Sequence, residues 1–313
     1  MKDNRQALSI FGALVADAAS LGLHWLYDVD RLASVVTRRG EGAGFVPIDP
    51  MNYDGAAGYF AHGSRADGML SQYGECLRLA CGFAGSDGFN IDGYQKAFAQ
   101  FFGPGGAYCG YIDRPTRATL ENIGAEKLDP SGADDDQLPA VTRIPALVAA
   151  AKGGDPSQLD AVVRITNDND IAVAYASAFA ELLGLVIKGV DLDEALRQSI
   201  DNAEPNIKNG LLQACDTDES DSVKYAGEVG RACHLPTAMP VAFHIMKRAT
   251  SFQQAVETNI LAGGDSCGRA IIVGSVMAAR FGFEPARGIP LEWILTLQDG
   301  KNLWKECLVV AQG

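Results

Sequence analysis

Apolar residues recur at helical spacing along almost the whole chain, and this pattern constrains the fold more than any other feature. An apolar face that returns every three or four residues predicts an amphipathic helix, whereas a half-buried strand alternates. Strand signals are scarce, and the best of them is residues 44–48. We therefore expect an all-α protein, with helices over 5–23, 72–84, 91–102, 115–122, 138–152, 158–165, 169–188, 192–201, 222–230, 237–248, 252–261 and 267–281.

Two of these segments predict how the helices pack. Residues 169–188 are apolar almost all round, which indicates a central buried helix. Residues 267–281 carry Gly274, Ala278 and Ala279, small residues that permit close helix contact. The sequence has 313 residues, 47% of them hydrophobic, with no internal repeat or low-complexity linker. We expect one compact many-helix domain over residues 1–313.

Charge and cysteine usage narrow the class of protein. A net charge of −13 argues against nucleic acid or an anionic membrane as the main partner. Seven cysteines, odd in number and without a CxxC pair, predict reduced thiols in a cytoplasmic protein. The first residues have some features of a signal peptide, but Asp3 and Asp17 interrupt it and the pattern continues as a helix. No stretch has the roughly 20 uninterrupted apolar residues of a membrane span.

Polar residues cluster at four helix ends. The first cluster, in "HWLYD", contains His24, Trp25, Tyr27 and Asp28, which form either a packed helix end or one wall of a site. The second precedes the helix expected from residue 72. Ser71 with an acid in the first turn is a normal helix start, and the same residues are equally placed to serve a site. This second cluster comprises Ser71, Tyr73 and Glu75.

The third cluster is Asp134, Asp135 and Asp136. Three carboxylates are more than capping a helix requires, so a cation, a ligand hydroxyl or an arginine such as Arg143 is expected beside them. The fourth cluster, "GGDSCGR", is the most site-like. Its glycines permit close backbone approach, and the free N–H groups of the following helix are suited to a phosphate. It contains Gly263, Gly264, Asp265, Ser266, Cys267 and Arg269.

Several familiar motifs are missing from the sequence. It has no P-loop, GxGxxG, GxSxG or HExxH pattern. The histidines at 24, 62, 234 and 244 do not have metal-ligand spacing, so zinc chemistry of the usual kind is not expected. Aromatic residues near the clusters could stack on an adenine or belong to the core: Trp25, Tyr73, Tyr108 and Tyr111.

Taken in order, these stretches resemble the ADP-ribosylglycohydrolase family, which includes dinitrogenase-reductase-activating glycohydrolase and the J1 crystallins. The resemblance implies an all-α orthogonal bundle that removes ADP-ribose from proteins or small molecules, usually with two magnesium ions. It rests on "GALVADAASLGLHWLYD", "GSRADGMLSQYGE", "YIDRPTRATLENI", "DDDQLPAVTRIPAL", "TNDNDIAVAYASA" and "ILAGGDSCGRAIIVGSVMAARFG".

The metal motifs of the family are incomplete in this sequence. The family's Thr-Asp-Asp-Thr falls on residues 71–74, which read Ser-Gln-Tyr-Gly, and its Gly-Gly-Asp-Thr-Asp-Thr falls on residues 263–268. The early Gly-Asp-Ala matches residues 16–18, and an acid expected further on falls on His24. By this match only Asp265 and Ser71 remain as metal ligands. We therefore expect magnesium only if a cation is retained, and otherwise no cofactor.

Three functions remain open. The first is a metal-free hydrolase that cleaves an N- or O-glycosidic bond of a small ribosyl compound or an ADP-ribosylated substrate, with His24, Glu75 and Asp265 transferring protons. Residues expected to bind that substrate are Asp17, Trp25, Ser71, Tyr73, Asp134, Asp135, Asp136, Asn167, Gly264, Ser266, Cys267 and Arg269.

The second function is a non-catalytic relative that binds a nucleotide-sugar ligand or has a structural role. Lens crystallins of the same family show that the fold persists without catalysis. The third is thiol or mononuclear-metal chemistry, for which His24 and Asp265 would converge on Cys267.

Overall fold

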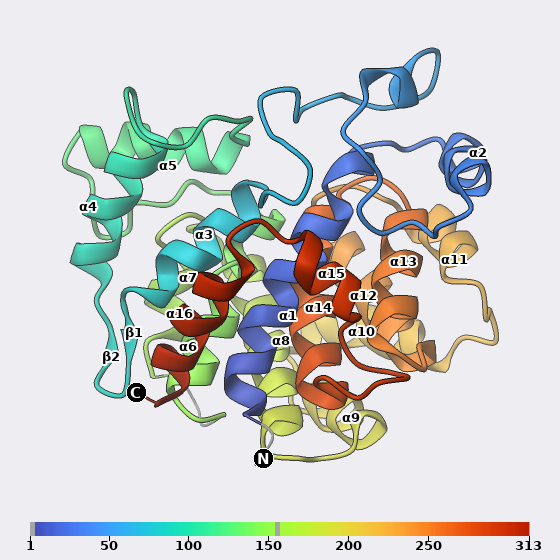
Figure 1. The fold of residues 1–313 in the computed structure, drawn as a ribbon. Coiled ribbons are helices and arrows are strands. Elements are labelled where there is room, and N and C mark those ends of the chain that lie inside the picture. Colours follow the sequence, from blue (N-terminus) through green and yellow to red (C-terminus); the bar gives the residue numbers. More distant parts are fainter. Residues whose placement is uncertain (1–3, 154–156, 313) are drawn as a thin grey trace.

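Helices make up most of the computed structural model, which describes residues 4–153 and 157–312 (Figure 1). One short antiparallel ribbon pairs β1 (Ala84–Gly85) with β2 (Gly88–Phe89). Three 3₁₀ turns are η1 (Leu21–Leu23), η2 (Pro50–Tyr53) and η3 (Leu138–Val141). The α-helices are α1 (Arg5–Ser20), α2 (Val29–Arg39), α3 (Gln72–Cys81), α4 (Ile91–Phe102), α5 (Arg114–Gly124), α6 (Ile144–Ala150), α7 (Leu159–Val163), α8 (Asp170–Ile187), α9 (Leu192–Asp201), α10 (Pro205–Asp216), α11 (Ser222–Val229), α12 (Leu235–Arg248), α13 (Phe252–Leu261), α14 (Ser266–Phe281), α15 (Leu291–Thr296) and α16 (Gly300–Gln312).

The two innermost helices, α1 and α14, lie against each other at glycine. A Cβ atom built on Gly12 would lie 2.1 Å from Cβ of Ala278, and one on Gly274 would lie 2.5 Å from Cβ of Ala16. No real side chain tolerates such distances, so the two backbones meet where side chains are absent. This confirms the close helix contact expected from Gly274 and Ala278.

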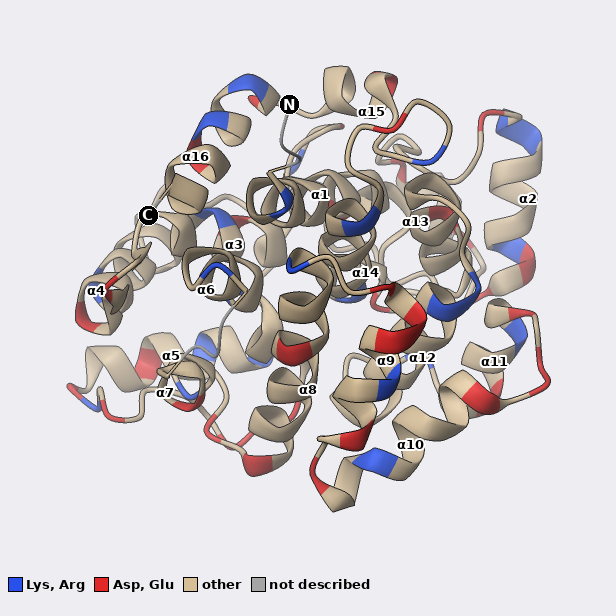
Figure 2. Ribbon diagram, turned by 90° about the horizontal axis from the view of Figure 1, so that it is seen from below, with Lys and Arg blue, Asp and Glu red and all other residues tan. Residues whose placement is uncertain are grey.

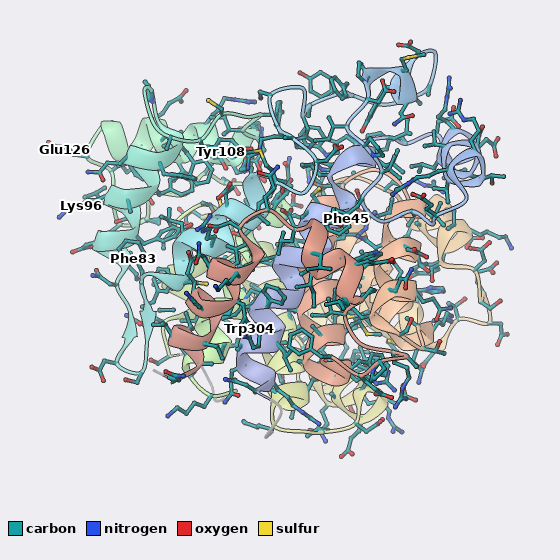
Figure 3. All side chains as sticks on the ribbon, in the orientation of Figure 1. Phe45, Phe83, Lys96, Tyr108, Glu126 and Trp304 are labelled. Carbon is teal, nitrogen blue, oxygen red and sulfur yellow. The ribbon has the colours of Figure 1, made fainter. Side chains whose placement is uncertain are left out.

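The other helices surround this pair. In Figure 1, α16 lies to the left of α1, α14 and α15 lie to its right, and α8 lies behind it. The indole of Trp304 on α16, labelled in Figure 3, packs edge-on against Phe11 of α1 at a centroid distance of 5.3 Å. Charged residues lie mainly on outer helices such as α2, α9 and α11 (Figure 2). One continuous hydrophobic core runs through the bundle.

The expected helices agree with the structure to within a few residues, with some corrections. The predicted strand at 44–48 is wrong, because this segment turns at residues 44–45 and Phe45 has a positive φ of 53°. Residues 138–152 form η3 and then α6, which starts at a proline-containing first turn. The structure also contains helices that the periodicity did not predict: α2, α10, α15 and α16.

Within residues 4–153 and 157–312, two helical segments are long and apolar enough to cross a membrane by length and composition. They are Arg5–Leu23, which is 94% buried within the protein, and Asp170–Ile187, which is 67% buried. Both are core helices of this fold. The helix at 169–188, which we expected to be central and buried, is buried over two thirds of its length, and the first helix is buried more completely.

Candidate functional site

Three of the four predicted clusters meet at the buried carboxylate of Asp265. Its Oδ1 accepts hydrogen bonds from His24 Nε2 at 3.0 Å and from the backbone N–H of Gly268 at 2.9 Å. The hydroxyl of Tyr73 donates to its Oδ2 at 2.7 Å. Burial alone would raise the pKa of Asp265, but the bonds from His24, Tyr73 and Gly268 hold it below its usual value. Asp265 is therefore an ionised, fully bonded group.

His62 extends this network, and sequence reasoning did not place it there. Its Nε2 lies 2.6 Å from Nδ1 of His24. Because His24 Nε2 donates to a carboxylate, its Nδ1 accepts, and His62 Nε2 carries the shared proton. Burial, followed by the neighbouring His24, lowers the pKa of His62 to about 2. The ring is neutral, and its Nδ1 has no hydrogen-bond partner among the described residues. His62 lies in a loop 38 residues from His24 in the sequence, so no spacing pattern predicts their contact.

Asp17 forms a second buried pair with Ser71, the residue that caps α3. The backbone N–H of Ser71 donates to Oδ2 of Asp17 at 2.7 Å, and the Ser71 hydroxyl donates to Oδ1. Burial raises the pKa of Asp17 to about 7. The Cys267 thiol lies 3.6 Å from the carbonyl oxygen of Asp17, and burial raises its pKa well above normal. All three side chains are fully buried.

The start of α14 is closed by protein groups. Gly264 has φ +67°, and a Cβ on it would lie 2.0 Å from the carbonyl oxygen of Arg231. Arg269 points into the core, where its guanidinium donates to Asn259 Oδ1 at 2.9 Å and to the carbonyl of Gly263 at 2.6 Å. Ser266 is buried, and its hydroxyl makes no hydrogen bond within the described chain. The phosphate expected at this helix start would have to displace these contacts.

The three aspartates of the third cluster bind side chains from three different segments. Asp135 pairs with Arg114, Asp136 bonds His234, and Asp134 accepts from Asn169. Arg143, the arginine that the sequence offered as their partner, lies elsewhere in the core and donates to the carbonyl of Val162 at 3.1 Å.

Asn167 holds this acidic loop in place through hydrogen bonds to its backbone. Its buried side-chain amide donates to the carbonyl oxygens of Asp135 at 2.9 Å and Gln137 at 3.2 Å. Thr166 donates to its Oδ1 at 2.7 Å. Asn167 therefore positions the loop, and it does so from a fully buried location.

An aromatic group covers His24 on the solvent side. The rings of Trp25 and His24 lie 4.6 Å apart, and Tyr111 packs edge-on against Trp25 at 4.7 Å. Tyr59 is 57% exposed and contacts both Trp25 and Tyr111. We call Trp25, Tyr59 and Tyr111 the aromatic rim. Trp25 has φ +62°, a conformation that non-glycine residues adopt at a cost and that often marks a functional position.

Polar groups continue from the aromatic rim around the site. Arg114 at the start of α5 is largely exposed in its pair with Asp135, and His234 is half-exposed beside Asp136. Asp113, the buried cap of α5, accepts from the Gln72 amide at 2.7 Å. Burial raises the pKa of Asp113 to about 6. Sequence reasoning did not select Asp113, Arg114 or His234.

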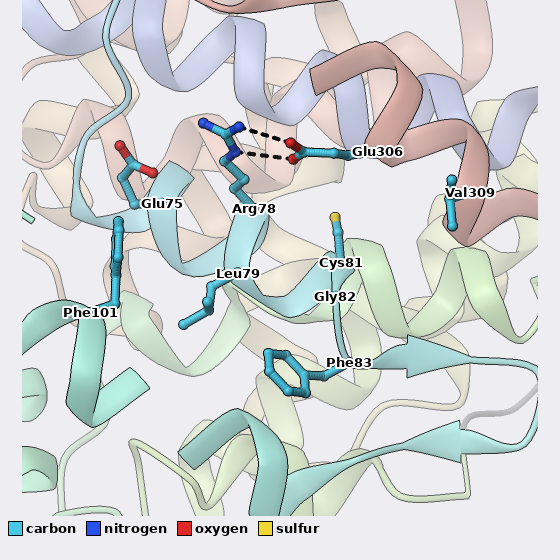
Figure 4. A pocket seen from close by; sticks show the side chains of 9 residues that line it. All are labelled: Glu75, Arg78, Leu79, Cys81, Gly82, Phe83, Phe101, Glu306 and Val309. Atoms are coloured by element: carbon cyan, nitrogen blue, oxygen red, sulfur yellow. Dashed lines mark hydrogen bonds and ion pairs between the residues drawn. The ribbon is translucent and has the colours of Figure 1, made fainter. Parts of the chain in front are cut away.

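Asp28 and Glu75 also lie apart from the Asp265 network. Asp28 caps α2 by accepting from the N–H of Arg31 at 2.9 Å. Glu75 pairs with Arg65 at 2.7 Å and lines a separate cavity of about 410 Å³. In Figure 4 this cavity lies between α3, α4 and α16, and the Arg78–Glu306 ion pair borders it.

The residues present do not fit the two magnesium ions that the family resemblance implies. Magnesium needs several oxygen ligands in near-octahedral geometry. Both oxygens of Asp265 and both oxygens of Asp17 already accept hydrogen bonds from protein groups. Beside them lie the Ser71 hydroxyl, which donates to Asp17, and imidazoles, a phenol and a thiol, which are poor magnesium ligands.

Comparisons with known proteins agree with the fold and the motifs. The sequence model of the ADP-ribosylglycohydrolase family matches residues 2–312, and the chain belongs to this family. Its relatives include two proteins of Tripedalia cystophora. Crystallin J1A is 30% identical over 96% of this chain and 94% of its own length. Crystallin J1B is 28% identical over 97% of this chain and 94% of its own length.

A solved structure shares the fold. It is described as an ADP-ribosylglycohydrolase-related protein complex, and it superposes with a TM-score of 0.68 at 16% sequence identity. The match covers all of this chain and 99% of that one. The all-α fold of the family is therefore confirmed, and the family supports either a glycohydrolase-like protein or an inactive member.

Proposed function

We propose that this protein binds a ribosyl or nucleotide-sugar ligand and does not hydrolyse it through a dimetal centre. The observation that carries the proposal is the state of Asp265 and Asp17. Each is fully buried, and each has both carboxylate oxygens engaged by protein donors. An ion or a reacting hydroxyl would have to share or displace these bonds at every one of the four oxygens.

The ligand site in this proposal is the exposed border of the network rather than its buried centre. The aromatic rim offers ring faces for a base, and Arg114 offers a guanidinium for a phosphate. Asp135 and Asp136, beside Arg114 and His234, would accept from ribose hydroxyls. The positive φ of Trp25 favours a binding role, since its strained backbone is held by two hydrogen bonds to other segments.

Asp113 favours a second candidate, metal-free hydrolysis at the same site. A carboxyl with a pKa of about 6 is protonated in part near neutral pH, as a general acid requires. Asp113 immediately precedes Arg114 in the sequence. It is buried, and its two oxygens accept from the Gln72 amide and from the N–H of Thr116, so in this candidate ligand binding would have to open one of these bonds. In this case Asp113, rather than Glu75, would protonate the leaving group.

The test is calorimetric titration with ADP-ribose, with magnesium and again with a chelator, followed by a hydrolysis assay on an ADP-ribosylated small molecule. We expect binding that does not change with chelator, and no product. Product that disappears in Asp113→Asn would establish the second candidate. Magnesium-dependent binding, or no binding in either condition, would overturn the proposal.

A further inference from the structure

We propose that His24, His62 and Cys267 form a buried site for one thiophilic transition-metal ion, such as Zn²⁺ or Cu⁺. One ligand atom from each residue lies within 4.8 Å of the other two. The three residues come from distant parts of the sequence and are at most 3% exposed. The proposal does not depend on whether the aromatic rim binds a ribosyl ligand.

The two imidazoles already face each other through one ring nitrogen each. Nδ1 of His24 and Nε2 of His62 lie 2.6 Å apart and share one proton. In a tetrahedral site with bonds of about 2.05 Å to nitrogen and 2.3 Å to sulfur, ligand atoms are separated by about 3.3–3.6 Å. When an ion binds, the proton on His62 Nε2 would move to Nδ1 of the same ring, and the Cys267 thiol would release its proton to solvent. The ligand atoms then need to shift by about 1 Å.

Asp265 is not one of the three ligands, but it orients one of them, His24. It accepts from His24 Nε2 at 3.0 Å, so the opposite nitrogen of the same ring carries the free lone pair. Metal-binding histidines commonly have this second partner, which fixes the ring and its tautomer. In this arrangement Asp265 positions His24 without contacting the ion.

Charge balance suits an ion in this buried position. Burying an uncompensated charge is very costly, so a buried ion requires negative partners. A Cys267 thiolate neutralises Cu⁺, while the thiolate together with the Asp265 carboxylate neutralises Zn²⁺. A thiolate and two imidazoles are soft or borderline ligands, which select these ions over Mg²⁺. This differs from the oxygen-rich dimagnesium centre of the family.

The test is to refold the full chain from denaturant with Co²⁺ or Zn²⁺ and to remove loosely held ion with chelator. Because the site is buried, the ion must enter during folding. We expect about one ion per chain and, with Co²⁺, an absorption band from sulfur-to-cobalt charge transfer. Folded wild-type protein with no retained ion or no such band would overturn the proposal, whatever the variants do.

Matched variants distinguish this site from adventitious binding. In Cys267→Ser and in His62→Gln we expect the number of ions retained per chain to fall at least tenfold. Cys109→Ser and His234→Gln alter an exposed thiol and an exposed imidazole, and they should leave the metal content unchanged. Equal metal content in Cys267→Ser and wild type would contradict the proposed site. Titration with ADP-ribose of metal-loaded and metal-free protein tests the ligand site independently.

Discussion

The hydroxyl of Tyr73 donates to Asp265 across 2.7 Å, joining the first turn of α3 to the cap of α14. Both residues are buried, so the bond is out of contact with water. By resemblance to the family, position 73 should hold a metal-binding carboxylate. It holds instead the phenol of Tyr73, which donates a hydrogen bond to the remaining acid, Asp265. The network thus links helices that are far apart in the sequence.

Tyr73→Phe tests how much this bond stabilises the protein. The change leaves Asp265 Oδ2 buried without its donor, which costs about 1–3 kcal/mol. Thermal or denaturant unfolding should show this loss. Tyr59→Phe, at an exposed hydroxyl, is the control and should unfold like wild type. If the two variants proved equally stable, the Tyr73 bond would have no net stabilising effect.

Gly274→Ala tests the contact between α1 and α14. The added methyl group would meet Cβ of Ala16 and the carbonyl oxygen of Gly12, and we expect a loss of about 1–3 kcal/mol or more. Gly210→Ala within α10 is the matched control, since its nearest neighbour would be 3.8 Å away. Its free energy of unfolding, measured by chemical denaturation, should rise by about 0.5–1 kcal/mol. A stable Gly274→Ala protein would contradict the packing described.

Arg143 is a buried cation with no carboxylate among its described contacts, and its substitution tests how such a charge is held. Its guanidinium donates to the carbonyl of Val162 and to the hydroxyl of Thr166, and it lies over the ring of Tyr94. Arg143→Lys keeps the charge but loses the planar fork, so we expect a loss of about 2–4 kcal/mol by denaturant titration. Arg197→Lys, on an exposed helix surface, should change stability by less than about 0.5 kcal/mol.

His244 gives the protein a predictable sensitivity to acid. Burial lowers the pKa of His244 from 6.5 to about 4, and the ring bonds Ser222 and the carbonyl of Glu219. Between these pKa values the unfolded state binds the proton and the folded state does not. The free energy of unfolding therefore falls as pH decreases from 6.5 to about 4. His244→Gln should reduce this slope, measured by urea titration at several pH values, and an unchanged slope would exclude His244 as its source.

The aromatic rim should determine ligand affinity if the proposed function is correct. Trp25→Ala and Tyr111→Ala each remove a ring face, and loss of base stacking costs about 1–3 kcal/mol. We expect ADP-ribose to bind about 10- to 100-fold more weakly to each, by calorimetry. Phe283→Ala removes an exposed ring that is not part of the aromatic rim, and this variant should bind ADP-ribose normally. Unchanged affinity in both rim variants would place the ligand elsewhere.

Sequence periodicity predicted the all-α fold, since helices such as α4, α9 and α13 begin and end where the pattern does. It missed α10, which begins at Pro205, and α16, whose apolar face is narrow. The predicted cluster around His24 and Asp265 lies together in the structure. His62 could not be predicted from spacing, because its loop reaches His24 only through the folded chain. Glu75 carries a local helix-start signal, and only the fold shows that it faces another cavity.

The glycine contact between α1 and α14 also determines when the core can form during synthesis. Helix α1 ends at Ser20 and leaves the ribosome long before α14, the helix that it packs against, which begins at Ser266. At cellular rates the apolar helix then waits on the order of tens of seconds for its partner. The core therefore closes late, and a nascent chain stalled before α14 exposes α1 to aggregation or to a chaperone.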